Sequence, residues 1–270
     1  MRQVVKALLT AFILIMPTTA FAGECGDVNN DDAVNIFDIT YLITFLYLGG
    51  PVPDCGPEIG TVTDIDGNMY FTIKIGDQWW MMENLRVTHY RNGDAIPNVA
   101  DSYDWTTLTT GAYCEYDNDP SNVAVYGRLY NWYAVGDGRN IAPEGWHVPS
   151  DDEWKQLEMY LGMSPTDADA EDWRGNNEGG KMKETSTGHW TDPNSDATNE
   201  SGFTALPGGY RNSDTYGNFY NMGLIARLWS STEYHSEAAW CRYLSYTYSK
   251  VYRYSNISKR NGFSVRCVKD

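Results

Sequence analysis

The sequence lacks the short motifs that mark the common classes of enzyme. No G-x-S-x-G, no H-E-x-x-H and no phosphate-binding glycine loop occurs in the chain. Histidine is scarce, and its four copies stand apart from any serine or cysteine motif: His89, His147, His189 and His235. His147, within Gly-Trp-His-Val-Pro, is predicted to be a hydrogen-bonded structural residue. We therefore expect a protein that is not an enzyme; an enzyme of unrecognised chemistry is the alternative.

Basic side chains are in the minority. There are 20 Lys and Arg against 36 Asp and Glu, which gives a formal net charge of −16 and an isoelectric point near 4.5. Phosphate backbones and anionic membrane surfaces repel such a chain, so we expect no nucleic-acid partner.

Long apolar runs are missing as well. No stretch is long enough to cross a bilayer comfortably, and we expect no membrane span.

Residues 1–22 have the pattern of a secretory signal peptide. Arg2 and Lys6 form a basic start, residues 7–16 are apolar, and Ala20-Phe21-Ala22 is a small-x-small cleavage site before Gly23. The sequence therefore predicts a secreted, extracellular or cell-surface protein.

High aromatic content, with 10 Trp and 20 Tyr, indicates a folded chain in which these rings need burial or a ligand.

Cysteine is present in an odd number, five copies, which leaves the pairing open. Export permits disulfides, and we predict the pairs Cys25–Cys55 and Cys241–Cys267. Closing the first loop would stabilise a small module by roughly 3–4 kcal/mol. Cys114 is left over and is expected to be buried.

An acidic loop lies between the first two cysteines. Calcium prefers six to eight hard oxygen ligands, and a twelve-residue loop can supply them from side chains, one backbone carbonyl and water. The loop offers side chains at positions 1, 3, 5, 9 and 12 and a carbonyl at position 7: Asp27, Asn29, Asp31, Asn35, Asp38 and Ala33. We predict a calcium site here; a solvated acidic loop before a helix is the alternative.

This loop and the apolar segment after it resemble one calcium-binding repeat of a type I dockerin. Ile39, Leu42, Ile43 and Leu46 have helical spacing, and Gly49-Gly50 ends the pattern. Asp32 replaces the expected glycine, at a cost of roughly 1 kcal/mol for the left-handed conformation. The resemblance implies calcium as cofactor. Working dockerins carry two repeats, so one repeat argues against cohesin binding.

The chain divides into a signal peptide at 1–22, the dockerin-like repeat at 23–56, a linker at 57–60 and a large domain at 61–270. In the large domain, residues 61–65, 69–75 and 78–82 predict a three-stranded meander. Ser150 and Glu153 predict a capping box that starts a helix ending at Gly162. Residues 164–200 are polar and are expected to form a long surface excursion. Short strands are predicted at 203–206, 228–231, 239–244, 250–254 and 262–268.

Several phrases of the large domain occur in order as in a known family. They are DIDGNMYFTIKIGDQWWMMENL, YGRLYNWYAV, APEGWHVPSDDEW, ESGFTALPGGYRN, LWSSTEY and NGFSVRCVKD. Residues 61–270 thus resemble the Fibrobacter succinogenes major paralogous domain family. The resemblance implies an α+β fold similar to C-type-lectin-like and formylglycine-generating-enzyme-like domains, in which residues 61–75 lie near residues 262–268. A β-sandwich is the rival.

Aromatic and polar residues of the late loops could form a sugar site, because Trp and Tyr rings stack on sugar faces while polar groups bond hydroxyls. The predicted ligand-binding residues are Tyr210, Arg211, Tyr216, Tyr220, Trp229, Glu233 and Trp240. Burial in the core is the alternative for each ring.

Further calcium sites are conceivable at two clusters that are also typical of turns: Asp117, Asp119 and Asn122, and Asp192, Asn194 and Asp196.

The leading hypothesis is a non-catalytic binding protein that recognises polysaccharide or an extracellular protein partner. A calcium-stabilised module precedes its lectin-like domain. The alternative is a structural component of an extracellular assembly that docks through the dockerin-like module.

Overall fold

The computed structural model describes residues 34–48, 57–213 and 216–270. Contacts divide the chain into two compact units, Met1–Gly56 and Pro57–Asp270. The predicted signal peptide and the Cys25–Cys55 pair lie outside the described residues, as do four of the six predicted calcium ligands, namely Asp27, Asn29, Asp31 and Ala33. Within the described ranges, no helix is long and apolar enough to cross a membrane.

The first unit contains the predicted helix, α2 (Ile36–Leu48). Its Thr40 and Thr44 hydroxyls each donate to the backbone carbonyl four residues earlier, which satisfies them on an otherwise apolar helix. Most of its large apolar side chains are exposed: Ile36, Phe37, Ile39, Ile43, Leu46, Tyr47 and Leu48.

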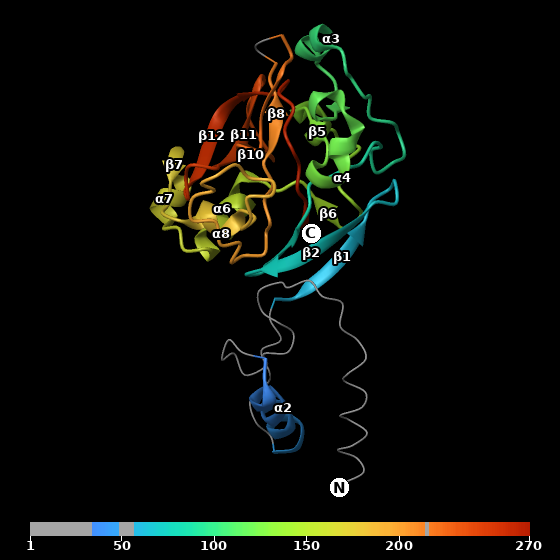
Figure 1. The fold of residues 1–270 in the computed structure, drawn as a ribbon. Helices are drawn as coiled ribbons and strands as arrows, with labels where there is room; N and C mark the ends of the chain where they lie inside the picture. The colour runs from blue at the N-terminus through green and yellow to red at the C-terminus, as the bar shows by residue number, and fades with distance from the viewer. Residues whose placement is uncertain (1–33, 49–56, 214–215) are drawn as a thin grey trace. The chain divides into compact units, whose positions relative to one another are not determined.

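The second unit is α+β, with three sheets and short helices (Figure 1). Its first sheet has the order β1-β2-β3-β13-β6. The predicted meander forms its first half, with turns at Gly67 and Gly76 that both have positive φ, the region that glycine tolerates best. The strands are β1 (Ile59–Thr63), β2 (Met69–Ile75), β3 (Gln78–Met81), β6 (Trp146–His147) and β13 (Val268–Lys269).

Two boundaries of this sheet differ from expectation. β1 begins at Ile59, inside the predicted linker 57–60, because Ile59 already pairs with Ile73. The last strand does join the first sheet, but Val268 pairs with Trp80 of β3 and with His147 of β6 rather than with residues 61–75. In the sheet β3 lies between the two segments, which are still near each other as predicted, since Ile73 and Val268 belong to one hydrophobic cluster.

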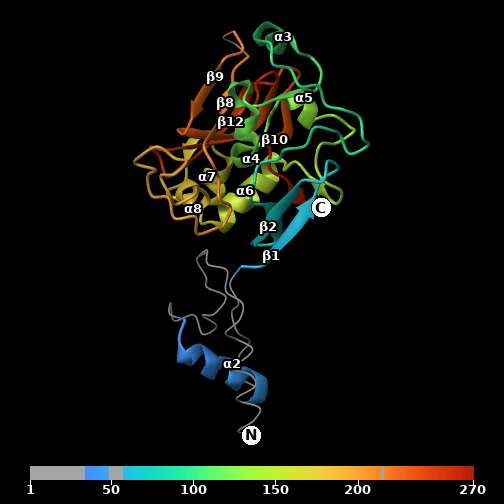
Figure 2. The same ribbon diagram turned by 45° about the vertical axis from the view of Figure 1, so that its right-hand side comes forward.

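The second sheet is larger and has the order β7-β12-β11-β10-β8-β9. Figure 1 labels four of its strands side by side, β12, β11, β10 and β8, and Figure 2 labels the edge strand β9 next to β8. All neighbours are antiparallel except β8 and β10, which are parallel. The strands are β7 (Asp172–Arg174), β8 (Gly208–Arg211), β9 (Phe219–Met222), β10 (Ile225–His235), β11 (Ala238–Ser245) and β12 (Val251–Ser258).

The predicted helix is α6 (Asp151–Tyr160), and its capping box is confirmed. The Ser150 hydroxyl accepts from the Glu153 backbone N–H, while the Glu153 carboxylate accepts from the Ser150 N–H. Trp154 and Leu157 on its inner face are fully buried. The remaining elements are short: α3 (Ser102–Thr107), β4 (Tyr113–Cys114), η1 (Tyr116–Asn118), η2 (Pro120–Asn122), α4 (Val123–Tyr126), β5 (Leu129–Tyr130), α5 (Trp132–Val135), α7 (Pro165–Asp169) and α8 (Glu178–Met182).

A buried charge network ties α6 to the large sheet. Asp151 accepts from Arg242 of β11 and Arg253 of β12, both at 2.7 Å. Glu158 accepts from Arg242 and forms an ion pair with Arg174 of β7, both at 2.7 Å. Because unpaired charges are costly to bury, these contacts fix the helix over one face of the sheet. Leu228 and Leu244 on that face pack with Trp154 and Leu157 in one hydrophobic cluster.

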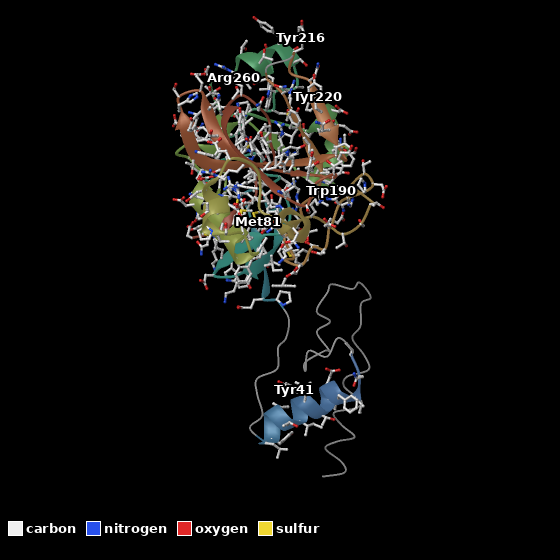
Figure 3. The ribbon with its side chains drawn as sticks, turned by 90° about the vertical axis from the view of Figure 1, so that its left-hand side faces the viewer. Tyr41, Met81, Trp190, Tyr216, Tyr220 and Arg260 are labelled. Atoms are coloured by element: carbon white, nitrogen blue, oxygen red, sulfur yellow. The ribbon has the colours of Figure 1, made fainter. Side chains whose placement is uncertain are left out.

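Residues 164–200 correct the prediction of a surface excursion. They contain β7, an edge strand of the large sheet, and Trp190, whose ring is fully buried and whose Nε1 donates to the Ala205 carbonyl (labelled in Figure 3). The buried Lys183 ammonium donates to three backbone carbonyls. The segment is mostly polar, so its composition did not indicate the few residues that are buried in the core.

The predicted Cys241–Cys267 disulfide is not formed. Cys114, Cys241 and Cys267 are free, buried thiols. Cys241 lies in β11 of the large sheet, whereas Cys267 directly precedes β13 of the other sheet, and both pack as small apolar groups in one hydrophobic cluster. Burial raises the pKa of the Cys241 thiol to about 11, so it stays protonated at neutral pH.

Candidate functional site

One residue from each strand of the large sheet enters a continuous row on one face. Register pairs Trp173 with Tyr252, Tyr252 with Tyr243, and Tyr243 with Arg227. The parallel pairing of Ala226 with Gly209 places the next residues, Arg227 and Tyr210, beside each other, and Tyr210 pairs with Tyr220. We call these six residues the cross-strand row: Trp173, Tyr252, Tyr243, Arg227, Tyr210 and Tyr220.

Every neighbour in the cross-strand row contacts the next through a ring. The ring centroids of Trp173 and Tyr252 are 5.1 Å apart, and those of Tyr252 and Tyr243 are 5.7 Å apart. The Arg227 guanidinium carbon lies 5.4 Å from the Tyr243 centroid and 4.0 Å from that of Tyr210. Tyr210 and Tyr220 complete the row with centroids 5.8 Å apart.

All six side chains are partly exposed, while their chain neighbours on the inner strands are buried. Alternate residues of a strand face opposite sides, so the row faces away from α6 and its cluster. Five inter-strand gaps of about 4.8 Å give the row a length of about 24 Å. The row is therefore an extended line of partly exposed side chains, in which Tyr210 also packs against the hydrophobic core.

The row carries a few polar groups at its Trp173 end. The Tyr252 hydroxyl donates to Asp172 at 2.9 Å. Burial and this contact together raise the pKa of Tyr252 to about 12, so its phenol remains a donor at neutral pH. Tyr248, about half exposed, extends the row by stacking on Trp173 with a centroid distance of 4.4 Å.

The structure brings two of the predicted ligand-binding residues together, Tyr210 and Tyr220, in the cross-strand row. Arg211 and Trp229 are corrections, because both side chains are fully buried. The Arg211 guanidinium donates to the carbonyls of Val99, Ala100 and Gly217, and the Trp229 Nε1 donates to the Tyr130 carbonyl. Their polar atoms hold backbone together and are not accessible to a ligand.

The other three predicted residues lie apart from the row. Tyr216 is 85% exposed and borders a pocket of about 310 Å³ with Tyr103; Figure 3 labels it above Tyr220. Glu233 pairs with Lys259 Nζ at 3.0 Å. Trp240 is covered by the Arg253 guanidinium, 3.7 Å from its ring.

The late acidic clusters behave as turns. Asp117, Asn194 and Asp196 have positive φ, Asp119 caps η2 by accepting from Ser121, and Asn194 donates to two backbone carbonyls. Across the part of the chain that the structure describes, no three His, Cys, Asp or Glu side chains converge as a metal site.

Two of the six predicted N-terminal calcium ligands are described, at the start of α2. Asp38 is almost fully buried and accepts from the Asn35 backbone N–H at 2.6 Å, while Asn35 accepts from Phe37 N–H at 2.7 Å. Oxygen-rich side chains therefore gather where the loop meets the helix, and calcium at this site stays a prediction.

The histidines make structural contacts. His147 lies between Glu153 and Asp270, with each ring nitrogen 2.7 Å from a carboxylate oxygen. His89 Nδ1 contacts both Asp66 and the Thr88 hydroxyl. A catalytic triad needs its nucleophile and its acid on opposite ring nitrogens. The hydroxyl and the carboxylate beside His89 contact the same nitrogen, so these three residues do not match a triad.

Comparison with known proteins gives one match. Residues 73–269 match the family model described as the Fibrobacter succinogenes major domain, a range that includes the entire cross-strand row. No curated protein and no solved structure matches the chain.

Proposed function

The chain belongs to the Fibrobacter succinogenes major domain family, and we propose that it is a secreted or cell-surface, non-catalytic protein that binds polysaccharide. The observation that carries this proposal is the cross-strand row. Aromatic rings with a few adjacent polar groups are the common composition of a site for an amphipathic ligand. A row about 24 Å long suits an extended chain of sugar rings better than a single small molecule.

A purely structural role for the row is the competing explanation. Cross-strand aromatic pairs stabilise a sheet by roughly 0.2–1 kcal/mol each whether or not a ligand binds. Two features favour recognition: all six side chains keep exposed surface, and Tyr248 adds a half-exposed ring beyond the sheet register.

The test replaces Trp173 by Ala and measures the binding of a panel of plant and bacterial polysaccharides by affinity electrophoresis. Loss of one stacking ring is expected to weaken binding by about 3- to 10-fold. Trp240→Ala is the matched control, because this half-buried Trp lies outside the row. Equal affinity of wild type and Trp173→Ala for every polysaccharide that binds would contradict the proposal.

We further propose a C-type-lectin-like arrangement and calcium as the cofactor of the N-terminal unit. A final strand that shares a sheet with the first three strands, one well-capped helix and long irregular connections support the first. The buried Asp38 beside Asn35 supports the second, because a carboxylate at the last loop position is what a calcium loop requires.

A second function, assembly through the N-terminal unit, is favoured by the exposed apolar side chains of α2. Light scattering on the full chain with calcium and with excess chelator tests it. An assembly role predicts a larger mass with calcium that falls on chelation. A monomer in both conditions argues against it.

A further inference from the structure

We infer that Arg227 makes the cross-strand row selective for polysaccharides that carry widely spaced carboxylate groups, such as a xylan with uronic acid branches. The inference rests on the proposed polysaccharide-binding function and names the substrate class for the same surface. It follows from the position of one arginine side chain and from the aromatic rings that hold its guanidinium.

Arg227 is unusual among the arginines in the three described ranges. Each of the others donates a hydrogen bond or forms an ion pair inside the protein, whereas Arg227 does neither. Its guanidinium is held only by rings: Tyr210 at 4.0 Å, Phe263 at 5.3 Å and Tyr243 at 5.4 Å. The Nε atom is buried with no partner.

A guanidinium that is fixed by aromatic rings and has no ion pair inside the protein is preorganised to bind an anionic ligand. Stacking on aromatic rings fixes its plane, so little conformational freedom remains to be lost on binding. Its N–H donors form a fork that matches a carboxylate with two parallel hydrogen bonds. Arg253 shows this geometry elsewhere in the sheet, since its Nε and Nη2 donate to the two carboxylate oxygens of Asp151.

The place of Arg227 in the row defines the spacing of charge on the ligand. Two rings, Tyr210 and Tyr220, lie on one side of it, and Tyr243, Tyr252 and Trp173 lie on the other. A bound chain would thus stack neutral sugars on both sides of one carboxylate. The net charge of −16 repels a densely charged polyanion, which also favours sparse carboxylates over a continuous uronate polymer.

The experiment measures Kd of the full chain for a glucuronoxylan and for the same polymer after chemical reduction of its carboxyl groups. Wild type is expected to bind the native polymer about 10- to 100-fold more tightly, the usual range for hydrogen bonds to a charged group. Arg227→Gln should abolish this preference and still bind the reduced polymer. Arg227→Lys should keep part of it, since the charge remains without the fork.

Arg139→Gln is the matched control. Arg139 also stacks on a tyrosine, with its guanidinium carbon 4.0 Å from the Tyr90 ring, but it pairs with Asp94 and Asp137 outside the row. This variant changes the net charge by the same amount and should keep the preference. Trp173→Ala should weaken both polymer forms equally.

The possible results separate the two proposals. If wild type binds both forms equally, or if Arg227→Gln keeps the preference, the inference is wrong while polysaccharide binding stands. If wild type binds neither these polymers nor any other polysaccharide, both are wrong. Should Arg227→Gln fail to fold, the wild-type ratio between native and reduced polymer still decides the question.

Discussion

His147 connects the start of α6 to Asp270 through one imidazole that touches two carboxylates. The hydrogen bond to Glu153, with a smaller contribution from Asp270, raises the pKa of His147 above its usual range. Burial alone would raise the pKa of Glu153, but the bonds from His147 and Ser150 outweigh it and lower that pKa. Each group therefore favours the charged form of the other.

These shifts predict how stability depends on pH. The His147 contribution is fully present below pH of about 6.5, the unfolded pKa, and is lost as pH rises through the higher folded pKa. The Glu153 contribution is present above about pH 4.3 and is lost as pH falls. Urea unfolding of wild type and His147→Gln at pH 5.5 and 8.5 is the measurement. The two proteins should differ more at pH 5.5.

His235→Gln serves as the control, because His235 is exposed, lies beside the Tyr234 ring and bonds only the Asn256 amide and a backbone N–H through its ring nitrogens. Its stability difference from wild type should stay small at both pH values. An equal loss for His147→Gln at pH 5.5 and pH 8.5 would contradict the account of this contact.

At the scale of elements, α6 is held to the large sheet by charges that are almost fully buried. Burial would raise the pKa of Asp151, but hydrogen bonds and charges from Arg253 and Arg242 dominate and lower it to about 2. Asp151→Asn leaves the buried Arg253 guanidinium without a carboxylate and leaves Arg242 with Glu158 alone. We expect a loss of about 3–5 kcal/mol in the free energy of unfolding, measured by urea titration at pH 7.

The adjacent Asp152 provides the comparison, since its side chain is 87% exposed and pairs only with Lys155. Asp152→Asn should cost less than about 1 kcal/mol. If the two substitutions destabilise the protein to the same small extent, the network does not fix α6 as described.

The meander, α2, α6 and strands β10 to β12 were predictable, because their signals are local, whereas the short strands β4 to β9 were not predicted and residues 203–206 form no named strand. Ser150 and Glu153 predicted the start of α6, and glycines marked the turns of the meander. The cross-strand row was not predictable, because its contacts depend on register between distant segments. Trp173 and Tyr252 are paired across the sheet, yet the polar sequence around Trp173 concealed β7.

Strand alternation explains why Arg227, and not the predicted Arg211, lies in the row. Tyr210 and Arg211 are adjacent in β8, so their side chains face opposite sides, and only Tyr210 reaches the partly exposed face. Arg227, in the neighbouring strand β10, occupies that face instead. The alternation of Tyr252 and Tyr254 with buried neighbours was a signal for this face, but the sequence did not indicate its partners.

At the scale of the whole molecule, the second unit presents one face of its large sheet to α6 and carries the cross-strand row on the other. One sheet therefore serves both stability and the proposed recognition. The face toward α6 contains the arginines that pair with Asp151, whereas the opposite face contains Arg227, which is held by aromatic rings.

The most direct test of polysaccharide binding by this face is an isothermal titration of the full chain with a polysaccharide that wild type binds, repeated for the double variant Trp173→Ala/Tyr252→Ala. Near-ultraviolet circular dichroism must show that both proteins are folded. The account predicts that Kd rises by about 10-fold or more in the double variant. An unchanged Kd would contradict it and would assign the row to sheet stability alone.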